Sequence, residues 1–499
     1  MYIKIGLSPY AYTKAILCPP IIRRKKLMAV STLSAGAAPA IEFDTSLIRK
    51  LKQTGPRYTS YPTADRFSGD FSSWDYLHAV ASVRVQGPRQ PLSLYIHIPF
   101  CDTICYYCAC NKIVTRDRNK AATYLEYLKR EIEMQGKLFS GINQVEQLHF
   151  GGGTPTYLSD AQMDDLLAHI RRWFKLAPDD AGEYSIEVDP RTVSPERVHT
   201  LRRQGFNRIS LGVQDFDPDV QKAVNRIQAE EETLAVIAAA RAAGFRSISI
   251  DLIYGLPRQN PVSMGLTLDK VIAASPDRIA IYNYAHLPHI FKPQRRIHDT
   301  DLPSADSKLD MLHLCITRLT DAGYVYIGMD HFAKPGDDLA IAQKQGRLHR
   351  NFQGYSTHAD ADMVACGVSA ISAVGTTYSQ NEKTLDAYYE RIAQGELPMA
   401  KGIRLTMDDL IRRTVIQNLM CHFELSMSAI ELSYPISFDE YFADELVRLR
   451  QFEADGLIRF DGDWMCVTEK GRLLIRNICM VFDRYLNGQA QPARYSTTI

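Results

Sequence analysis

The amino-acid sequence predicts an α/β protein built around an open barrel of six strand–helix units plus an extra strand. From residue 92 onward, short strand-like apolar runs alternate with longer amphipathic segments. Strand, helix and strand at this spacing indicate a parallel sheet with right-handed crossovers. The chain of 499 residues is longer than one ordinary core requires, so we expect further domains beside the barrel.

Composition and pattern divide the chain into four predicted parts. Residues 1–41 form a disordered or mis-assigned N-terminal extension, 42–91 an N-terminal arm and lid, 92–350 the barrel, and 351–499 a mostly helical C-terminal domain. The extension places a basic cluster after a Pro-interrupted apolar stretch and has no periodic pattern, so we expect Met28 to be the true start. An organellar transit peptide is the alternative.

Two segments flank the predicted barrel. Between residues 42 and 75 the aromatic residues and prolines lie too close together for regular structure, so this arm either packs over another domain or covers the substrate. After residue 384 amphipathic helices follow, and 453–476 read as a helix, a hairpin and a closing helix, as in a winged helical module. DNA binding is disfavoured, because the acidic side chains of Asp461 and Asp463 on the hairpin would face the negative phosphates of DNA. We therefore interpret this part as a packing and substrate-cap domain.

Seven apolar runs are the predicted strands of the barrel: residues 92–99, 145–150, 184–188, 208–213, 247–253, 278–284 and 324–329. Amphipathic segments such as 121–137 and 231–243 predict helices between them. In such barrels the functional residues lie where the strands end. Polar and glycine residues collect at those positions here: Cys101, 151–154, Glu187, Asp189, Gln214, Asp215, Asp251, Ala285, His286, Asp330 and His331. This arrangement indicates an enzyme.

The charge balance excludes several broad classes of function. The chain has 58 Lys and Arg residues and 57 Asp and Glu residues, a net charge of +1. It therefore lacks the overall excess of positive charge that is typical of proteins that bind nucleic acids or membrane surfaces. No uncharged apolar run approaches the roughly 20 residues of a membrane-spanning helix. Four of the ten cysteines crowd into one loop and six are scattered, which is no disulfide framework and fits a reducing cytoplasm.

The crowded loop contains Cys101, Cys105 and Cys108 in a C-x3-C-x2-C pattern, followed by Cys110. Iron–sulfur clusters are held by thiolates, and a three-thiolate loop leaves one iron open to a small molecule. Zinc is disfavoured because no second ligand pair follows at suitable spacing. A redox dithiol is disfavoured by the extra thiols, and inert buried cysteines suit a polar loop poorly. The pattern favours an iron–sulfur cluster.

The cysteine pattern, with an aromatic residue before its last cysteine, resembles that of the radical S-adenosylmethionine (SAM) superfamily. The longer stretch 95–110, which includes Cys110, is similar to the oxygen-independent coproporphyrinogen III oxidase family. Six further stretches share this resemblance: 55–62, 151–155, 212–216, 283–288, 328–332 and 351–355. The resemblance extends from about Phe43 to the C-terminus and implies an open radical SAM barrel of the (β/α)6 type.

The resemblance also implies two ligand positions beside the cluster. Cys101, Cys105 and Cys108 would hold a [4Fe-4S] cluster. Around the cluster-bound SAM it places Tyr95, Tyr107, Gly152, Glu187 and Ile371. Around a second position, described for the family as another SAM, it places Gly153, Thr154, Gln214, Arg226, Asp251 and Ala285. Substrate in the second position, a structural Arg226–Asp251 ion pair, and a simple tight turn at the glycine run remain alternatives.

The activity implied is oxidative decarboxylation of two propionates of coproporphyrinogen III to vinyl groups, giving protoporphyrinogen IX for haem biosynthesis. An electron donor such as a flavodoxin or ferredoxin and an unidentified terminal acceptor are expected, with a monomeric enzyme in the cytoplasm. Phe352 and Gln353 would orient the substrate or second ligand. Cys110 has either a substrate-side or redox role or a supporting one.

Basic residues that flank the predicted mouth are candidates for binding propionates: Arg57, Lys112, Arg116 and Arg350. Two other classes of function remain open at this stage. A haem chaperone would share the barrel, but such relatives lack the fourth cysteine and the arm. Radical methyl transfer or haem degradation would also use this barrel.

Overall fold

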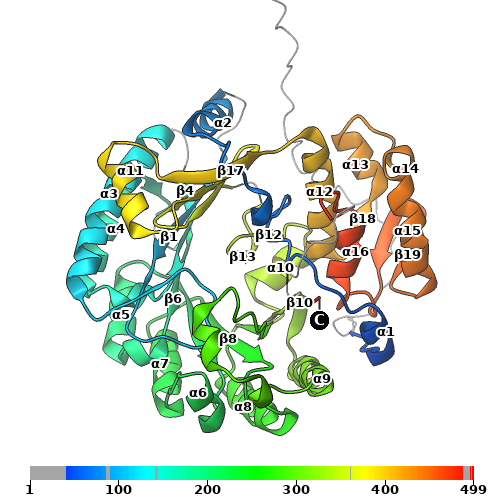
Figure 1. Cartoon of the computed structure of the whole chain (residues 1–499), viewed down its shortest axis with the longest axis horizontal. Helices are drawn as coiled ribbons and strands as arrows, with labels where there is room; N and C mark the ends of the chain where they lie inside the picture. The colour runs from blue at the N-terminus through cyan, green and yellow to red at the C-terminus, as the bar shows by residue number, and fades with distance from the viewer. Residues whose placement is uncertain are drawn as a thin grey trace, which may run out of the picture.

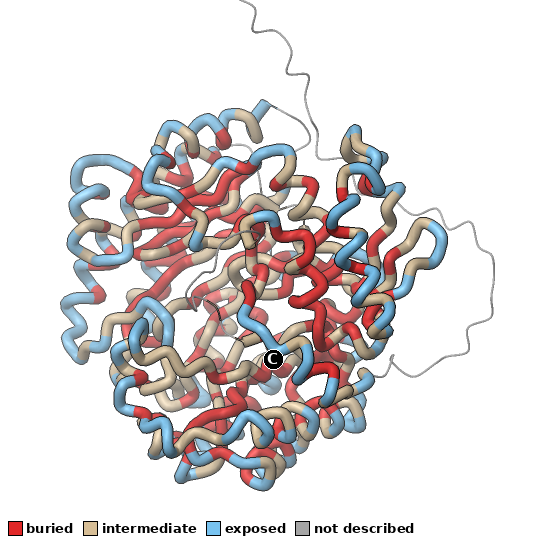
Figure 2. Tube along the Cα trace, turned by 45° about the vertical axis from the view of Figure 1, so that its right-hand side comes forward, coloured by how far each residue is buried: buried red, intermediate tan, exposed pale blue. Residues whose placement is uncertain are grey.

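The structure, a computed structural model, describes residues 41–85, 90–140, 144–178, 180–359, 361–486, 495, 497 and 498. The predicted extension up to residue 40 lies outside the described residues. The centre is a 13-stranded sheet whose strands run through the middle of the molecule, with helices around its outer face (Figure 1). Most of the strand backbone is buried, and the exposed residues lie on the outer helices (Figure 2).

Six parallel strands form the barrel as predicted: β1 (Leu92–Ile98), β4 (Gln144–Gly152), β6 (Glu183–Val188), β7 (Arg208–Gln214), β8 (Ser247–Tyr254) and β9 (Arg278–Asn283). Helices between or after them are α3 (Arg118–Phe139), α4 (Asp160–Trp173), α5 (Pro195–Arg203), α6 (Pro218–Ala223), α7 (Glu230–Ala242), α8 (Pro261–Ala274) and α9 (Ala305–Asp321). Neighbouring strands pair in parallel in the order β1, β4, β6, β7, β8, β9. The carboxyl ends of the six strands therefore meet on one side.

Local sequence explains where these helices begin. Ser159 and Gln162 form a capping box at the start of α4, and the Asn260 side chain accepts hydrogen bonds from Val262 and Ser263 N–H at the start of α8. These side chains satisfy backbone donors that a helix cannot pair internally. The strand-to-helix turns are therefore fixed locally, which holds the residues after each strand in place.

The edges of the sheet differ from the prediction. The expected seventh strand exists as β10 (Val325–Gly328), but β11 (His331–Ala333) lies antiparallel between it and β9. On the other side β14 (Asp362–Cys366) pairs in parallel with β1, and β15 (Ile371–Val374), β16 (Thr377–Asn381) and β17 (Met399–Arg404) extend the sheet antiparallel. The sheet thus continues past the predicted barrel boundary at residue 350. These strands were missed because short turns join them, so they do not show the alternation of strand and helix that identified the barrel strands.

A buried carboxylate ties this extension to the barrel. Glu131 on α3 is fully buried and accepts hydrogen bonds from Gly367 N–H (2.7 Å), Asn381 Nδ2 (2.7 Å) and Tyr388 Oη (2.6 Å). Burial raises the pKa of Glu131 to about 7, although these three donors act to lower it. Tyr388 lies on α11 (Leu385–Ala393), so one side chain connects a helix, a turn, a strand and a second helix.

The arm contains more regular structure than predicted. It forms α1 (Thr45–Lys50), η1 (Ala64–Arg66) and α2 (Ser73–Val85), and the Asp44 side chain caps α1 by accepting from Leu47 N–H at 3.0 Å. Tyr58 Oη donates to Asp483 Oδ2 at 3.0 Å. The arm, in blue, passes from α1 beside the C-terminal helices to α2 near the barrel (Figure 1).

The C-terminal part is mostly helical, as predicted. Its elements are α12 (Met407–His422), β18 (Glu424–Ser426), α13 (Met427–Ser433), α14 (Phe438–Tyr441), α15 (Ala443–Ala454), β19 (Ile458–Asp461), β20 (Trp464–Val467) and α16 (Ile475–Val481). The predicted hairpin is β19–β20, and β18 adds a third strand to it. Within the described part of the chain, no helix is both long and apolar enough to cross a membrane.

The remaining short elements connect these units. They are β2 (Phe100–Cys101), β3 (Ile113–Val114), η2 (Pro155–Tyr157), β5 (Lys175–Leu176), η3 (Pro190–Thr192), η4 (Lys292–Arg296), η5 (Asp299–Asp301), α10 (Asp338–Lys344), β12 (His349–Asn351) and β13 (Gly354–Ser356). Of these, β12 and β13 form a separate two-stranded hairpin. This hairpin lies close to the arm, because Arg350 Nε donates to the backbone oxygen of Arg57 at 3.3 Å.

Candidate active site

A cavity of about 1080 Å³ opens at the carboxyl ends of the barrel strands. It is large enough for a small-molecule ligand or cofactor. Most of the residues predicted for the site line it: Cys101, Cys105, Tyr107, Cys108, Cys110, Gly152, Gly153, Thr154, Glu187, Gln214, Arg226 and Asp251. They come from the loop after β1 and from the ends of β4, β6, β7 and β8, or the turns that follow them. Other residues expected at the strand ends do not line this cavity, among them Asp215, Ala285, His286, Asp330 and His331.

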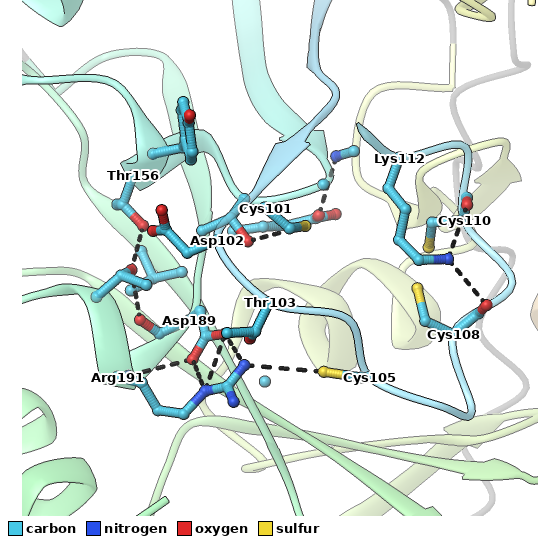
Figure 3. Close-up of a pocket in the computed structure, with 18 of the residues that line it drawn as sticks. Cys101, Asp102, Thr103, Cys105, Cys108, Cys110, Lys112, Thr156, Asp189 and Arg191 are labelled. Atoms are coloured by element: carbon cyan, nitrogen blue, oxygen red, sulfur yellow. Dashed lines mark hydrogen bonds and ion pairs between the residues drawn. The ribbon is translucent and has the colours of Figure 1, made fainter. Parts of the chain in front are cut away.

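The four thiols of the cysteine loop face this cavity but have different partners (Figure 3). Cys101 Sγ lies 3.4 Å from Thr154 Oγ1, and Cys105 Sγ accepts a hydrogen bond from Arg226 Nη1 at 3.5 Å. Lys112 Nζ donates to the backbone oxygen of Cys108 at 3.0 Å. In the part of the chain that the structure describes, no three His, Cys, Asp or Glu side chains lie close enough together to hold a metal ion.

Nearby positive charge, hydrogen bonds and burial give the thiols of the cysteine loop different pKa values. A hydrogen bond with the Cys110 thiol, together with the nearby Lys112 ammonium, lowers the pKa of Cys108 to about 6 despite burial. The same hydrogen bond raises the pKa of Cys110 above its ordinary value. Burial raises the pKa of Cys101 to about 11. Cys108 is therefore the thiolate that the protein itself stabilises, while Cys110 is held as a thiol.

The glycine run after β4 is needed because protein atoms occupy the space beside each residue. A Cβ on Gly151 would lie 2.9 Å from Glu187 Oε1, and one on Gly152 would lie 2.6 Å from the His97 ring. A Cβ on Gly153 would lie 2.6 Å from the backbone oxygen of Pro99. Gly152 also has φ +116°, which favours glycine. The run thus allows β4 to pack directly against Glu187, His97 and the start of the cysteine loop.

Glu187 projects into the cavity from β6 and is held as an anion. Burial acts to raise its pKa, but hydrogen bonds from His149 Nε2 (3.2 Å) and Gly152 N–H (3.3 Å) prevail and lower it. His149 Nδ1 in turn lies 2.5 Å from Ser185 Oγ. A fixed carboxylate beside backbone N–H groups can bind the ammonium or hydroxyl groups of a ligand.

The neighbouring Asp251 on β8 is electrostatically different. Burial and the charge on Glu187 raise its pKa to about 7. Ser210 Oγ donates to Asp251 Oδ2 at 3.2 Å. Arg226 does not pair with Asp251; it pairs with Asp189, Nη1 to Oδ2, at 3.0 Å. The alternative of a structural Arg226–Asp251 ion pair is therefore wrong.

Comparison with known proteins gives consistent matches. The radical SAM superfamily model matches residues 95–271, and the HemN C-terminal domain model matches residues 405–474. The oxygen-independent coproporphyrinogen III oxidase of Pseudomonas aeruginosa is 53% identical over 446 residues, which are 89% of this chain and 96% of the relative. The protein of the same name from Escherichia coli is 51% identical over 459 residues, 92% of this chain and 99% of the relative.

A solved structure adds a match in three dimensions. Coproporphyrinogen III oxidase from Escherichia coli, described as a radical SAM enzyme, superposes with a TM-score of 0.85 at 50% identity, covering 90% of this chain and 100% of that one. This chain belongs to the oxygen-independent coproporphyrinogen III oxidase family. As a radical SAM protein of this family it uses a [4Fe-4S] cluster and SAM.

The cysteine loop fits the iron–sulfur cluster of the oxidase family in the kind and number of its ligands. Cys101, Cys105 and Cys108 are free thiols on one loop that faces the cavity, and three thiolates suffice for a cluster with one open iron. Arg191 Nη2 and Arg226 Nη1 approach Cys105 Sγ at 3.8 and 3.5 Å. Two guanidinium groups therefore lie beside the Cys105 sulfur.

Five residues predicted for the oxidase site do not line the cavity. Tyr95 stacks on His149 with ring centroids 5.7 Å apart, so it supports Glu187 indirectly. Ala285 offers only its backbone oxygen, to Gln294 Nε2 at 3.2 Å. The other three lie in or beside the β12–β13 hairpin region: Phe352, Gln353 and Ile371. Phe352 and Ile371 pack in a small apolar cluster with Phe67 of the arm.

Several residues that line the oxidase cavity were missed by the sequence analysis, among them Arg191 and Tyr282. Arg191 donates to Asp189 Oδ2 at 2.6 Å and to Cys105 Sγ. Tyr282 lies at the end of β9 and lines the same cavity. Both follow or end a predicted strand, so their position in the barrel was the signal that could have identified them.

Proposed function

We propose that this chain catalyses the oxygen-independent conversion of coproporphyrinogen III to protoporphyrinogen IX in haem biosynthesis. The observation that carries this conclusion is the four-cysteine loop facing a cavity of about 1080 Å³ at the strand ends. For each of two propionates, a β-hydrogen atom is removed, carbon dioxide leaves, and one electron passes to a terminal acceptor. Each propionate becomes a vinyl group.

The cofactors and the protein divide this chemistry between them. When bound, the cluster and SAM supply an electron and the 5′-deoxyadenosyl radical that removes the β-hydrogen. Cys101, Cys105 and Cys108 would hold the cluster. Glu187, kept ionised by its partners, is suited to the ammonium group of SAM, and Gly152 leaves its backbone accessible beside it. The protein thus binds and orients the cofactors in this cavity.

We assign a second ligand position to the same cavity. Gly153, Thr154, Gln214, Arg226 and Asp251 line it. Because Asp251 has a pKa of about 7, it can donate a hydrogen bond as well as accept one. These groups suit the hydroxyl groups of a second SAM or the edge of the substrate. Ala285, which is outside the cavity, would act only through its backbone.

The arm and the β12–β13 hairpin would enclose the substrate. Phe67 of the arm lies edge-on to Phe352, with ring centroids 6.4 Å apart. Gln353 Nε2 is buried without a hydrogen-bond partner in the described residues. We assign a lid role to the arm, and an orienting role toward substrate or second ligand to Phe352 and Gln353. Cys110, an exposed thiol on the cavity wall, would act on the substrate side.

An acidic electron donor, such as a flavodoxin or ferredoxin, would dock near the cysteine loop. Lys112 and Arg118 line the cavity there, and the Arg118 side chain is 53% exposed. Positive charge at the rim of a cavity steers an acidic partner. We expect the enzyme to act as a monomer in the cytoplasm.

One anaerobic assay tests the proposed function. The reconstituted protein is incubated with coproporphyrinogen III, SAM and a reductant, and protoporphyrinogen is measured together with methionine. Formation of both products supports the proposal, and a Cys105→Ala protein serves as the inactive control. Tight haem binding without any protoporphyrinogen would instead indicate a haem carrier.

A further inference from the structure

Arg350 is a buried cation that has no anionic partner among the residues that the structure describes. It lies on β12 and is only 3% exposed. Its Nε donates to the backbone oxygen of Arg57 at 3.3 Å, and its Cζ lies 4.7 Å from the centroid of the Tyr355 ring. Nη1 is buried and has no hydrogen-bond partner among the described residues. Burying a guanidinium group with an unused hydrogen-bond donor costs folding free energy unless a ligand accepts that hydrogen bond.

A second arginine lies beside it with a partner of its own. Arg57, in the arm, forms an ion pair with Asp330. Its side chain is 32% exposed, although residues of β9, β10 and α16 surround the small cavity of about 40 Å³ that it lines. Burial and the charge on Arg350 lower the pKa of Arg57. Asp330 and the buried Arg476 line the same small cavity, and Arg350 lies beside it, held to the Arg57 backbone.

The local charge does not balance. Arg57 and Asp330 neutralise one another, whereas Arg350 has no ion-pair partner in the described part of the chain. His331 adds no further positive charge, because burial and the charges on Arg350 and Arg57 lower its pKa well below the usual range. His331 Nδ1 is also buried without a hydrogen-bond partner there. Among Arg57, Asp330, His331 and Arg350, the charge on Arg350 is thus left uncompensated, and Arg350 Nη1 and His331 Nδ1 are unused polar atoms.

This cluster adjoins the main cavity through one aromatic ring. Tyr282 lines the cavity of about 1080 Å³. Arg57 Cζ lies 5.8 Å from the centroid of that ring, and the His331 ring meets it edge-on at 6.0 Å. The His331 ring also packs edge-on against Tyr355 at 5.3 Å, the ring over which Arg350 lies. Arg57 is therefore one aromatic ring away from the main cavity, whereas Arg350 is connected to that ring through Tyr355 and His331.

We propose that Arg350, together with Arg57, binds one carboxylate group of the substrate, a propionate that anchors the tetrapyrrole beyond Tyr282. One anion would compensate the single unpaired charge and use the free Nη1 of Arg350, in the paired geometry that guanidinium and carboxylate favour. Because the two arginines come from the arm and from the β12–β13 hairpin, the bound carboxylate also holds the lid against the barrel. This inference rests on the proposed function, since it assigns the carboxylate to its substrate.

The test separates carboxylate recognition from the rest of binding. Equilibrium dialysis measures binding of coproporphyrin III and of its tetramethyl ester to the anaerobic holoenzyme and to its Arg350→Gln and Arg350→Lys variants. Arg350→Gln should weaken binding of the acid about 10- to 100-fold, as loss of a charge-assisted hydrogen bond implies, and leave binding of the ester unchanged. The affinity of the Arg350→Lys protein for the acid should lie between those of the unmodified protein and of Arg350→Gln. Lysine keeps the positive charge but cannot form the two parallel hydrogen bonds of a guanidinium group.

Three further readouts decide the interpretation. Arg347→Gln, an exposed arginine on the same segment whose Nε donates to Gln345 Oε1 at 2.9 Å, is the matched control and should bind both porphyrins normally. In turnover, Arg350→Gln should raise KM for coproporphyrinogen III more than it lowers kcat. SAM binding should be unaffected; weakened SAM binding with normal porphyrin binding would assign the carboxylate to a second SAM and overturn the proposal.

Other outcomes are equally clear. Equal weakening of acid and ester, or an unchanged KM in both Arg350 variants, would also overturn it. If the unmodified protein binds coproporphyrin III through Arg350 but makes no protoporphyrinogen, the proposed function fails while the carboxylate site stands. Iron content and melting temperature of each variant show that the protein tested is folded and holds its cluster.

Discussion

Replacing Gly153 by alanine should disturb the cysteine loop through a single methyl group. Gly153 N–H donates to Ile98 O, and the next residue, Thr154, donates to Phe100 O, both at 2.8 Å. A Cβ at Gly153 would lie 2.6 Å from Pro99 O and 2.8 Å from Phe100 O. These are backbone atoms, so no side-chain rotation can relieve the contact.

The magnitude follows from the distance that must be recovered. Ordinary contact begins at 3.4 Å, so the loop must move by about 3.4 − 2.6 = 0.8 Å. Overpacking of this kind costs about 1–3 kcal/mol of folding free energy. A displacement near 1 Å in a catalytic loop costs about 100-fold in rate. Because Cys101 follows Phe100 directly, we expect Gly153→Ala to lose turnover far more than stability.

The assay compares turnover, iron content and thermal unfolding of the anaerobic protein. Gly336→Ala is the matched control, since a Cβ there meets nothing within 4 Å. Gly153→Ala should keep most of its iron, melt at a lower temperature and turn over about 100-fold more slowly, while Gly336→Ala should match the unmodified protein. Wild-type turnover and melting in Gly153→Ala would refute the argument from packing.

Three other predictions concern the thiols and the buried carboxylate. Replacing Cys101, Cys105 and Cys108 together by alanine should remove the expected roughly four irons per chain and the visible absorption; retained iron would place the cluster elsewhere. The Cys110→Ser protein should keep its iron and visible absorption but lose most of its turnover. A thiol two residues past Cys108 cannot bind the open iron without displacing the small-molecule ligand of that iron. Loss of iron, or normal turnover, would contradict this prediction. The raised pKa of Glu131, about 7 against 4.5 in the unfolded chain, contributes stability that is complete below pH 4.5 and lost as pH rises through 7. Melting temperature should therefore fall between pH 4.5 and 7, and more steeply than in Glu131→Gln; parallel slopes would argue against it.

Local pattern was sufficient for the six barrel strands. Each is a buried apolar run, from β1 at Leu92–Ile98 to β9 at Arg278–Asn283, and each is followed by turn and helix signals in the chain itself. The cysteine loop was equally readable, because ligand spacing is a property of consecutive residues. Position in the C-terminal half of a strand then located Glu187 and Asp251 on the cavity wall.

Pairing between distant segments was not readable in this way. The chain gives no local sign that β14 lies beside β1 or that β11 inserts between β9 and β10. Such short strands form because neighbouring strands offer them hydrogen-bonding edges, and those edges exist only in the folded sheet. The expected barrel boundary at residue 350 differed from the sheet for this reason.

The sequence by itself determined the barrel, the cysteine loop and the family to which the chain is similar, because these depend on periodicity and on spacing along the chain. Only the tertiary structure decided that Arg226 pairs with Asp189 and that Arg350 is buried beside Arg57, 293 residues away. The charge state and the partner of a side chain depend on burial and on neighbours that folding brings together. The sequence lists the charged groups, and the fold decides which of them are left without a partner.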